Sequence, residues 1–276
     1  MLAPMRGTIL LVGCGKMGGA LLEGWFKRGM NPVDVMVVEP AGRGEVAPCG
    51  AHPALTCLAK ATDIPRDFHP DVVVFAVKPQ IFDQAIPEYR RFVADGAVFL
   101  SVIAGKTTAA LRAHLGAEAK VVRTMPNTPA IVGKGITVCF AAPGIDDMHH
   151  RIAEVLMSAV GRVTWIADES LMDAVTAVSG SGPAYVFLLA ECLEEAGVAA
   201  GLPPQLAADL ARATVAGAGA MLGDLGDPAS TLRLNVTSPG GTTQAALQVL
   251  MGPDGLKQLM ARAVAAATER SRELGQ

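Results

Sequence analysis

Short runs of consecutive apolar residues alternate with longer mixed segments through the first 166 residues of the chain. Such runs, when they are rich in β-branched residues, are typical of buried strands. The predicted strands are Thr8–Val12, Val35–Glu39, Asp71–Val77, Val98–Ile103, Val121–Met125, Gly135–Phe140 and Val163–Ile166, with a helix predicted over Met17–Arg28 and closed by Gly29. Because apolar strands separated by helical segments are typical of a parallel sheet covered on both faces, the pattern predicts an α/β domain with a doubly wound sheet.

The pattern changes near residue 167, where the β-branched runs stop. The predicted helices beyond it are Asp168–Val178, Gly182–Ala200, Pro204–Leu222, Thr242–Leu250 and Leu256–Leu274, with Gly197 and Gly201 suited to helix ends. We therefore predict two domains, an α/β domain over residues 1–166 and an all-α domain over residues 167–276. The apolar helical faces are too many for so small a domain to bury alone, so a homo-oligomer is expected.

Composition and charge narrow the classes of function. The 276 residues are 51% hydrophobic and carry a formal net charge of −3, without a run of Lys or Arg, so nucleic-acid binding has little electrostatic support. No apolar segment reaches the roughly 18 residues of a membrane-spanning helix. The five cysteines are scattered and form no CxxC pair, which is typical of reduced thiols. We therefore expect a cytoplasmic protein with no nucleic-acid or membrane partner.

A glycine-rich motif directly follows the first predicted strand. Gly13, Gly15 and Gly18 form a GxGxxG sequence that also contains Lys16 and Met17. In this context the first glycine permits a tight turn, the second lets the backbone approach a pyrophosphate, and the third lets helix and strand pack closely. The helix N-terminus offers free N–H groups and the positive end of its dipole to the phosphates. The motif therefore predicts a Rossmann-type sheet and assigns these five residues to a dinucleotide site.

The second predicted strand ends at Glu39, 21 residues after Gly18. An acidic side chain at this position can accept hydrogen bonds from a ribose 2′-hydroxyl and would repel a 2′-phosphate, which favours NADH over NADPH. Arg43 could offset that repulsion, and a simple solvated strand end is the alternative interpretation of Glu39. NADH or NADPH is therefore the expected cofactor, with NADH preferred as a hypothesis.

Three further segments follow predicted strands and are expected on the same rim of the sheet, since ligands bind beyond the carboxyl ends of such strands. The candidate cofactor residues there are Ala76, Val77, Lys78, Pro79, Ala104, Gly105, Pro126 and Asn127. Lys78 could neutralise phosphate or bind ribose, although a surface lysine at a strand end is an equally good interpretation.

Two segments of the helical half are unusual in composition, residues 179–185 and residues 235–244. The second contains no ionisable side chain but is dense in hydroxyl groups and free backbone N–H groups, and it ends where a helix is predicted to begin. That combination suits a small anion such as a carboxylate. An ordinary capped loop with Thr242 as the N-cap is the structural alternative.

The ionisable residues also restrict the chemistry. No Ser–His–Asp order or HExxH motif is evident, and the adjacent pair His149 and His150 indicates a solvated helix start more than a metal site, so no metal is expected. Reduction of a ketone usually needs a general acid, whereas a protonated imine accepts hydride and becomes a neutral amine. A site of hydroxyls and amides is adequate for the second reaction.

These segments together resemble the pyrroline-5-carboxylate reductase family. The segments that match are VGCGKMGGAL, AVKPQ, SVIAGKTTAAL, VVRTMPNTPAIVGKG, AVSGSGPAYVFLLAE and LNVTSPGGTTQAAL, which run from residue 12 to residue 247. The resemblance implies a Rossmann domain followed by an all-α dimerisation domain, and the reduction of L-1-pyrroline-5-carboxylate to L-proline by NAD(P)H. It also implies a homodimer, five of which often form a decamer.

The resemblance further implies roles for individual residues. Thr243 would hydrogen-bond the ring nitrogen and act in catalysis, and the carboxylate would be held by Ser238, Gly240, Gly241 and Thr242. The AVKP and MPNTP blocks would line the nicotinamide side. One departure is Glu39-Pro40, where family members that favour NADPH tend to carry polar or basic residues.

Two alternatives stay open at this point. The β-hydroxyacid dehydrogenases also join a Rossmann half to a helical half, but they place a catalytic lysine on an interdomain helix, and the stretch Ala174–Glu191 has no lysine. A dinucleotide-binding sensor without catalysis is the other alternative.

Overall fold

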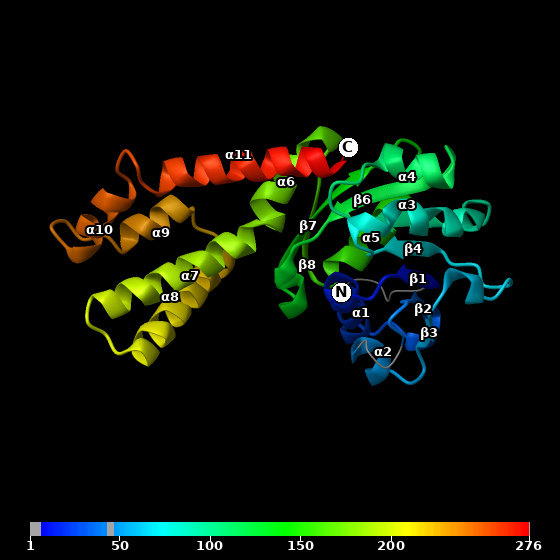
Figure 1. Ribbon diagram of the computed structural model, residues 1–276, viewed down its shortest axis with the longest axis horizontal. Coiled ribbons are helices and arrows are strands. Elements are labelled where there is room, and N and C mark those ends of the chain that lie inside the picture. The colour runs from blue at the N-terminus through cyan, green and yellow to red at the C-terminus, as the bar shows by residue number, and fades with distance from the viewer. Residues whose placement is uncertain (1–6, 43–46, 276) are drawn as a thin grey trace. The chain divides into compact units, whose positions relative to one another are not determined.

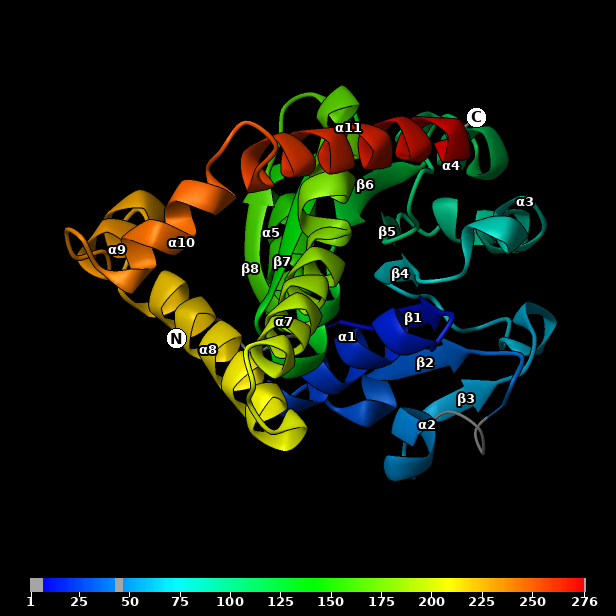
Figure 2. The ribbon, with the colours of Figure 1, turned by 60° about the vertical axis from the view of Figure 1, so that its left-hand side comes forward.

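The computed structural model describes residues 7–42 and 47–275, without the side chains of residues 47 and 48. Figure 1 and Figure 2 show its strands side by side, and within the described residues they form one eight-stranded sheet in the order β3-β2-β1-β4-β5-β6-β7-β8. The strands are β1 (Ile9–Val12), β2 (Val35–Val38), β3 (Thr56–Leu58), β4 (Val72–Phe75), β5 (Val98–Ser101), β6 (Lys120–Met125), β7 (Gly135–Ala141) and β8 (Gly161–Trp165). The seven predicted strands are therefore confirmed with shifted ends, and the three-residue edge strand β3 was missed.

The first six strands have the order of a doubly wound dinucleotide-binding sheet. Strands β2 and β3 lie on one side of β1, and β4, β5 and β6 lie on the other, so the strand order reverses between β1 and β4. The expectation of a wholly parallel sheet is wrong at one place, because β7 pairs antiparallel to β6. Residues 126–134 connect these two strands, and a parallel crossover needs about a dozen residues or more. The short connection therefore forces β7 to return beside β6.

The central strands are buried on both faces, and different helices cover the two faces. Alternate residues of β1 point to opposite sides, so Ile9 and Leu11 join one core while Leu10 and Val12 join the other. The first core also takes residues of α1 (Lys16–Lys27) and α5 (Asp147–Ser158), including the fully buried Trp25. The second takes residues of α3 (Phe82–Ala85), the 3₁₀ helix η4 (Ile86–Val93) and α4 (Thr108–Leu115). The remaining short elements here are α2 (Ala47–Ala51), η1 (Pro32–Asp34), η2 (Ala61–Asp63), η3 (Pro79–Ile81) and η5 (Thr128–Val132).

The helices after β8 differ in detail from the prediction. The single helix expected over Asp168–Val178 is instead a 3₁₀ turn, η6 (Glu169–Leu171), then α6 (Met172–Val175), then a π-helix over Thr176–Gly180. The Thr176 hydroxyl donates to the Met172 carbonyl over 2.9 Å and that of Ser179 to the Val175 carbonyl over 3.0 Å. Such back-bonding competes with the regular α-helical ladder, which explains the change of helix type.

The other helices are α7 (Gly182–Ala199), α8 (Pro204–Asp224), α9 (Ala229–Asn235), α10 (Thr242–Leu250) and α11 (Leu256–Gly275). Helix α9, which has seven residues, was missed. Gly201 follows the end of α7 with a φ of +99°, as a helix-ending glycine does. Gly197 does not end that helix but lies inside it, where a Cβ would press on Ala207 of α8, so this glycine serves helix packing.

The contacts divide the chain into two units. The first comprises the described residues up to Gly180 together with those from Thr268 onward, and the second is Ser181–Ala267. The domain boundary that we place between residues 166 and 167 remains a prediction. No helix in the described ranges is long and apolar enough to cross a membrane.

Candidate functional site

The glycine loop after β1 shows which of its glycines the protein itself requires. Gly13 has a φ of +90°, and a Cβ there would lie 2.7 Å from the carbonyl oxygen of Ala76, at the end of β4. A Cβ on Gly18 would collide with the Gly13 carbonyl oxygen. At Gly15, in contrast, a Cβ would meet no described atom within 4 Å and φ is −69°. Gly13 and Gly18 are thus explained by packing, whereas no packing contact within the described residues explains Gly15, which stays a predicted cofactor residue.

The first turn of α1 supports the same function. Gly15 is its N-cap and no side chain caps the helix there, so the N–H groups of Lys16 and Met17 lack an intrahelical partner. Cys14 is buried in the loop, and burial raises the pKa of its thiol to about 11. The thiol is therefore neutral near pH 7 and adds no negative charge beside a phosphate.

Glu39 lies directly beyond β2 and its carboxylate is bound to the glycine loop. Oε2 accepts a hydrogen bond from the backbone N–H of Cys14 over 2.8 Å, and Oε1 accepts one from the N–H of Ala41 over 3.2 Å. Glu39 is consequently more than a solvated strand end. Its negative charge stands beside the turn in which the cofactor ribose is expected. Arg43 lies outside the described residues.

The other predicted cofactor residues lie beyond the carboxyl ends of three neighbouring strands, as the parallel register of β4, β5 and β6 requires. Ala76 and Val77 follow β4, where the Ala76 N–H donates to the Val12 carbonyl over 2.8 Å. Lys78 is exposed and Pro79 starts η3. The turn after β5 contains Ala104 and Gly105, the latter with a φ of +77°. The first unit therefore gathers these segments with the glycine loop on one edge of the sheet.

Pro126 and Asn127 follow β6 at that same edge, and Pro126 is buried. The side chain of Asn127 is engaged at both ends, since Nδ2 donates to the Ser179 carbonyl over 3.2 Å and Oδ1 accepts from the Ile136 N–H over 2.9 Å. Its amide thus joins the connection before β7 to the end of the π-helix. This use of Asn127 was not expected from the sequence.

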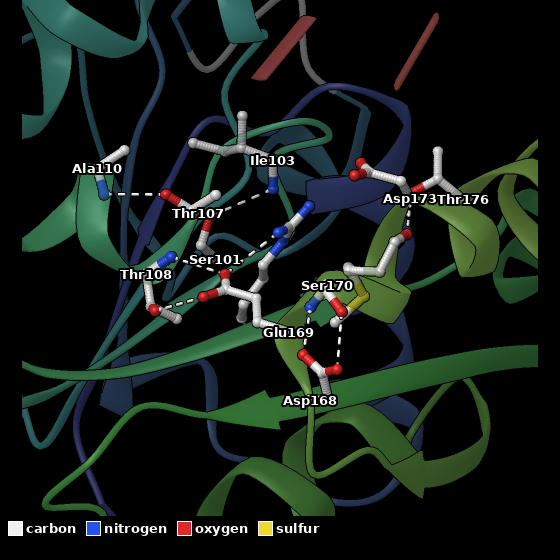
Figure 3. A network of polar contacts seen from close by, with 12 residues as sticks. Ser101, Ile103, Thr107, Thr108, Ala110, Asp168, Glu169, Ser170, Asp173 and Thr176 are labelled. Atoms are coloured by element: carbon white, nitrogen blue, oxygen red, sulfur yellow. Dashed lines mark hydrogen bonds and ion pairs between the residues drawn. The ribbon is translucent and has the colours of Figure 1, made fainter. Parts of the chain in front are cut away.

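A polar network next to the turn after β5 was not predicted from the sequence (Figure 3). The Glu169 carboxylate accepts hydrogen bonds from the N–H of Thr108 over 2.8 Å and from its hydroxyl over 2.7 Å. It also pairs with the guanidinium of Arg123 at 3.1 Å, although Arg123 is only 4% exposed. No local sequence signal could have found these contacts, because Glu169 lies 61 residues from Thr108.

The candidate substrate segment lies in the second unit, at the start of α10. Gly241 is the N-cap, so the alternative that Thr242 caps this helix is wrong, and no side chain caps the helix. The N–H groups of Thr242 and Thr243 lie in the first turn, where an α-helix provides no partner for them. The turn before them closes by a bond from the Gly241 N–H to the Ser238 carbonyl over 3.0 Å.

A second amide of this turn, that of Gly240, is bound by a side chain. The Gly240 N–H donates to Oε1 of Gln244 over 2.6 Å, and Gly240 has a φ of +71°. The side-chain oxygen of Gln244 therefore occupies the position that an oxygen of a bound carboxylate would take at this amide. Gln244 was not identified from the sequence as part of the site.

The predicted histidine pair lies in the first turn of α5. His149 is buried, which corrects the expectation that it is solvated, and its Nδ1 lies 2.6 Å from Oδ1 of Asp146. His150 packs its ring against Trp165. In the part of the chain that the structure describes, no group of three or more His, Cys, Asp and Glu residues has the arrangement of a metal site.

The fold and the glycine loop together define a dinucleotide-binding oxidoreductase domain joined to a helical region. Residues 8–105 match the family model described as "NADP oxidoreductase coenzyme F420-dependent", and residues 169–274 match the one described as "Pyrroline-5-carboxylate reductase dimerisation". The chain is 36% identical to the pyrroline-5-carboxylate reductase of Pisum sativum, over 97% of this chain and 96% of that protein. For the enzyme of the same name from Corynebacterium melassecola the identity is 38%, over 97% and 98%. The chain belongs to the pyrroline-5-carboxylate reductase family.

Solved structures agree with this assignment. A pyrroline-5-carboxylate reductase from Coxiella burnetii superposes with a TM-score of 0.87 at 32% identity, covering 99% of this chain and 100% of that one. A pyrroline carboxylate reductase from Plasmodium falciparum, solved with NADP bound, gives a TM-score of 0.83 at 29% identity over 98% and 99%. The predicted fold class and family are thereby confirmed, and neither the β-hydroxyacid dehydrogenases nor a non-catalytic sensor is favoured.

Proposed function

We propose that this chain catalyses the NAD(P)H-dependent reduction of L-1-pyrroline-5-carboxylate to L-proline, the last step of proline synthesis. The observation that carries the proposal is the likeness to pyrroline-5-carboxylate reductases over nearly the whole chain, which includes both the dinucleotide-binding and the helical part. The uncharged composition of residues 235–244 agrees with the chemistry, because an iminium ring needs no strong acid to accept hydride.

The cofactor is assigned to the edge of the first unit. Its pyrophosphate would lie over Gly15, where the loop leaves space that a Cβ would occupy, and against the free N–H groups at the start of α1. When bound, the reduced nicotinamide supplies the hydride. The segments Ala76–Pro79, Ala104–Gly105 and Pro126–Asn127 are assigned to the nicotinamide side.

Glu39 is assigned to the adenosine ribose, and the preferred cofactor is NADH. Its carboxylate is held in place by the Cys14 N–H, so it stays near the ribose and cannot easily turn away from a 2′-phosphate. That phosphate would bring about two further negative charges close to a fixed carboxylate. The proposal therefore predicts a higher kcat/KM with NADH than with NADPH.

The substrate is assigned to the second unit. The hydroxyl of Ser238 and the N–H groups of Gly240, Gly241 and Thr242 would hold the carboxylate, and the hydroxyl of Thr243 would hold the ring nitrogen. The positive end of the α10 dipole favours the carboxylate at this position. To bind at Gly240, the carboxylate must displace the side chain of Gln244, and at Gly241 it must share or replace the bond from that N–H to the Ser238 carbonyl.

The residues of this site bind and orient the substrate, and the positive charge that is neutralised by hydride is carried by the ring itself. Hydride addition to the imine carbon places an electron pair on nitrogen, and the protonated nitrogen thereby becomes a neutral amine. The Thr243 oxygen accepts a hydrogen bond from that N–H, which fixes the face of the ring that receives hydride. Most of the rate enhancement assigned to the protein thus comes from orientation.

Assembly and location follow from the same assignment. The chain forms homo-oligomers through its helical region, as the family model for residues 169–274 indicates. The finer proposal is a homodimer, of which five form a decamer, working in the cytoplasm without a nucleic-acid or membrane partner. The five cysteines, all described and all free, are compatible with a reducing compartment.

A spectrophotometric assay tests the function. The purified chain is mixed with pyrroline-5-carboxylate and either NADH or NADPH, and the loss of absorbance of the reduced cofactor is followed. We expect turnover with both and a higher kcat/KM with NADH. Turnover of 3-hydroxy acids in the reverse direction, or of neither substrate, would contradict the proposal. A strong preference for NADPH would contradict only the role of Glu39.

A further inference from the structure

The turn after β5, which is proposed to lie against the nicotinamide, is fixed by a hydrogen bond at each of its ends. Ser101, at the end of β5, is fully buried, and its hydroxyl accepts a hydrogen bond from the Ile103 N–H over 3.3 Å. Thr107 ends the turn and caps α4 by accepting from the Ala110 N–H over 3.1 Å. Between these two contacts lie Ala104 and Gly105, which have no polar side-chain atoms.

Glu169 reaches this turn from the segment that leads into the helical region (Figure 3). Its two carboxylate oxygens take both polar hydrogens of Thr108, the residue that follows the turn, at 2.8 and 2.7 Å. One of these oxygens also lies 3.1 Å from the guanidinium of Arg123 in β6. The side chain of Arg123 is 5% exposed and that of Glu169 is 21% exposed.

Because Arg123 is buried, removal of the Glu169 carboxylate is expected to destabilise the fold. A buried guanidinium without its partner is strongly destabilising, because the charge stays out of water without compensation. Charge-assisted hydrogen bonds of this length are also stronger than neutral ones. Glu169 therefore fixes the start of α4, and with it the end of the turn, relative to β6.

A second set of contacts reaches the same turn from the last described residues of the chain. Ser271 is 4% exposed and donates to Asp173 over 2.7 Å, which attaches the end of α11 beside Glu169's own segment. A Cβ built on Gly105 would lie 3.2 Å from the backbone of Leu274, and one on Gly275 would lie 2.8 Å from the Gly105 carbonyl oxygen. The turn thus has little freedom to move on this side.

We propose that Glu169 is a positioning residue for the cofactor. By holding Thr108 and Arg123 together, it keeps Ala104 and Gly105 in the place that the nicotinamide requires, and it joins the first residues of the helical region to the cofactor site. This role rests on the proposed function, since it assumes that the turn contacts the nicotinamide. It predicts that loss of the Glu169 charge weakens cofactor binding and leaves binding of the imine substrate nearly unchanged.

The variant Glu169→Gln keeps the size of the side chain and removes its charge. Cofactor affinity is measured directly, by titration of the chain with NADH and observation of the nicotinamide fluorescence. Since a lost hydrogen bond to a charged group is worth a factor of ten or more, we expect the Kd and the KM for NADH to rise about tenfold, with the KM for pyrroline-5-carboxylate within about twofold. Asp168→Asn is the matched control, because the side chain of Asp168 binds only Ser170 among the described contacts, and the variant should leave NADH binding unchanged.

A second variant, Thr108→Val, keeps the ion pair with Arg123 and removes one hydroxyl, so it decides the question if Glu169→Gln does not fold. We expect it to raise the Kd for NADH about threefold, as the loss of one hydrogen bond does. NADH binding like that of the unaltered chain in these variants would overturn the proposal, as would an equal rise of both KM values. If the unaltered chain binds NADH but does not reduce the imine, the proposed function is wrong, and the NADH titration still tests the role of Glu169.

Discussion

At the scale of single residues, the three glycines of the dinucleotide loop differ in which atoms a Cβ at each position would contact. Two of them face backbone atoms of the protein itself, whereas Gly15 faces open space. Packing therefore accounts for two glycines of the motif and not for Gly15, which we propose serves only the cofactor. This distinction can be tested without any assumption about the substrate.

Replacing Gly15 with alanine should leave folding intact and weaken the binding of the cofactor. The backbone at Gly15 is already in a region that alanine adopts, with a φ of −69° and a ψ of −158°. We expect an unchanged Tm and a Kd for NADH raised by about tenfold, which corresponds to about 1.4 kcal/mol. In Gly18→Ala, the collision with the Gly13 carbonyl should instead lower the stability by about 1–3 kcal/mol. Thermal unfolding and NADH titration of both variants measure the difference, and an equal loss of Tm in both would contradict it.

Thr243 carries the catalytic proposal, and its removal should affect the substrate alone. Because its hydroxyl is assigned to a cationic ring nitrogen, Thr243→Ala should lower kcat/KM for pyrroline-5-carboxylate by about 10- to 100-fold. The Kd for NADH should stay the same. Thr237→Ala offers a matched control, since the hydroxyl of Thr237 donates to the Arg233 carbonyl over 2.7 Å and has no assigned contact with the substrate. Steady-state kinetics decide, and unchanged kcat/KM in Thr243→Ala would remove that residue from its role.

The sequence could predict the glycine loop because each glycine answers a local demand of strand, turn and helix. It could also place Glu39 at the end of its strand, but not its bond to Cys14, which lies 25 residues away. Asn127 and Glu169 show the limit more clearly. Their partners are separated from them by 52 and 61 residues, and no short pattern encodes such a contact.

At the scale of elements, apolar runs predicted the positions of the longer strands, since a strand buried on both faces needs consecutive apolar residues. Strand β3 was not predicted because it has three residues, one exposed and two only partly buried. The direction of β7 depends on the length of a connection and not on the residues of the strand. The π-helix depends on hydroxyl groups that bond within one turn, so an apolar pattern could not reveal it.

Helix α5 offers a test of pH dependence through its N-cap, Asp146. Hydrogen bonds from the backbone N–H of His149, and then from its side chain, lower the pKa of Asp146 below its ordinary value of 3.8. A carboxyl group with a lowered folded pKa stabilises the fold at pH values above its unfolded pKa, and this stabilisation is lost as the pH falls through the folded pKa. We therefore expect Asp146→Asn to lower the Tm at pH 7 and to have a smaller effect below about pH 4. A difference in Tm that is the same at pH 7 and pH 2.5 would contradict this assignment.

At the scale of the whole molecule, the order of the two parts along the chain was predictable from the change of pattern near residue 167. The return of the last residues to the first unit was not. Ser271 and Asp173 are 98 residues apart, and no short pattern encodes their hydrogen bond. Ser179 and Ser271 both belong to the first unit, on either side of the second in the sequence, and each is hydrogen-bonded within the first unit, to Asn127 and to Asp173.

The helices of the second unit are the most unusual feature at this scale. Helix α7 has 18 residues and none of them is buried. Its exposed apolar residues include Val186, Phe187, Leu188, Leu189 and Leu193. An exposed apolar surface of this kind marks an interaction site in a soluble protein, and the dimerisation family model covers the whole helix. We therefore expect α7 to be buried between copies of this chain.

A single charge on α7 should then disrupt the assembly. Phe187 is 62% exposed, so Phe187→Glu should be tolerated by the isolated chain and rejected by an apolar interface, where an unpaired carboxylate loses its water. Sedimentation velocity should show an oligomer for the unaltered chain and a shift to the monomer for this variant. Val33→Glu is the matched control, because Val33 is 64% exposed in the first unit and lies outside the helical region. An oligomer that persists in Phe187→Glu, or an unaltered chain that sediments as a monomer, would show that α7 does not form the contact between subunits.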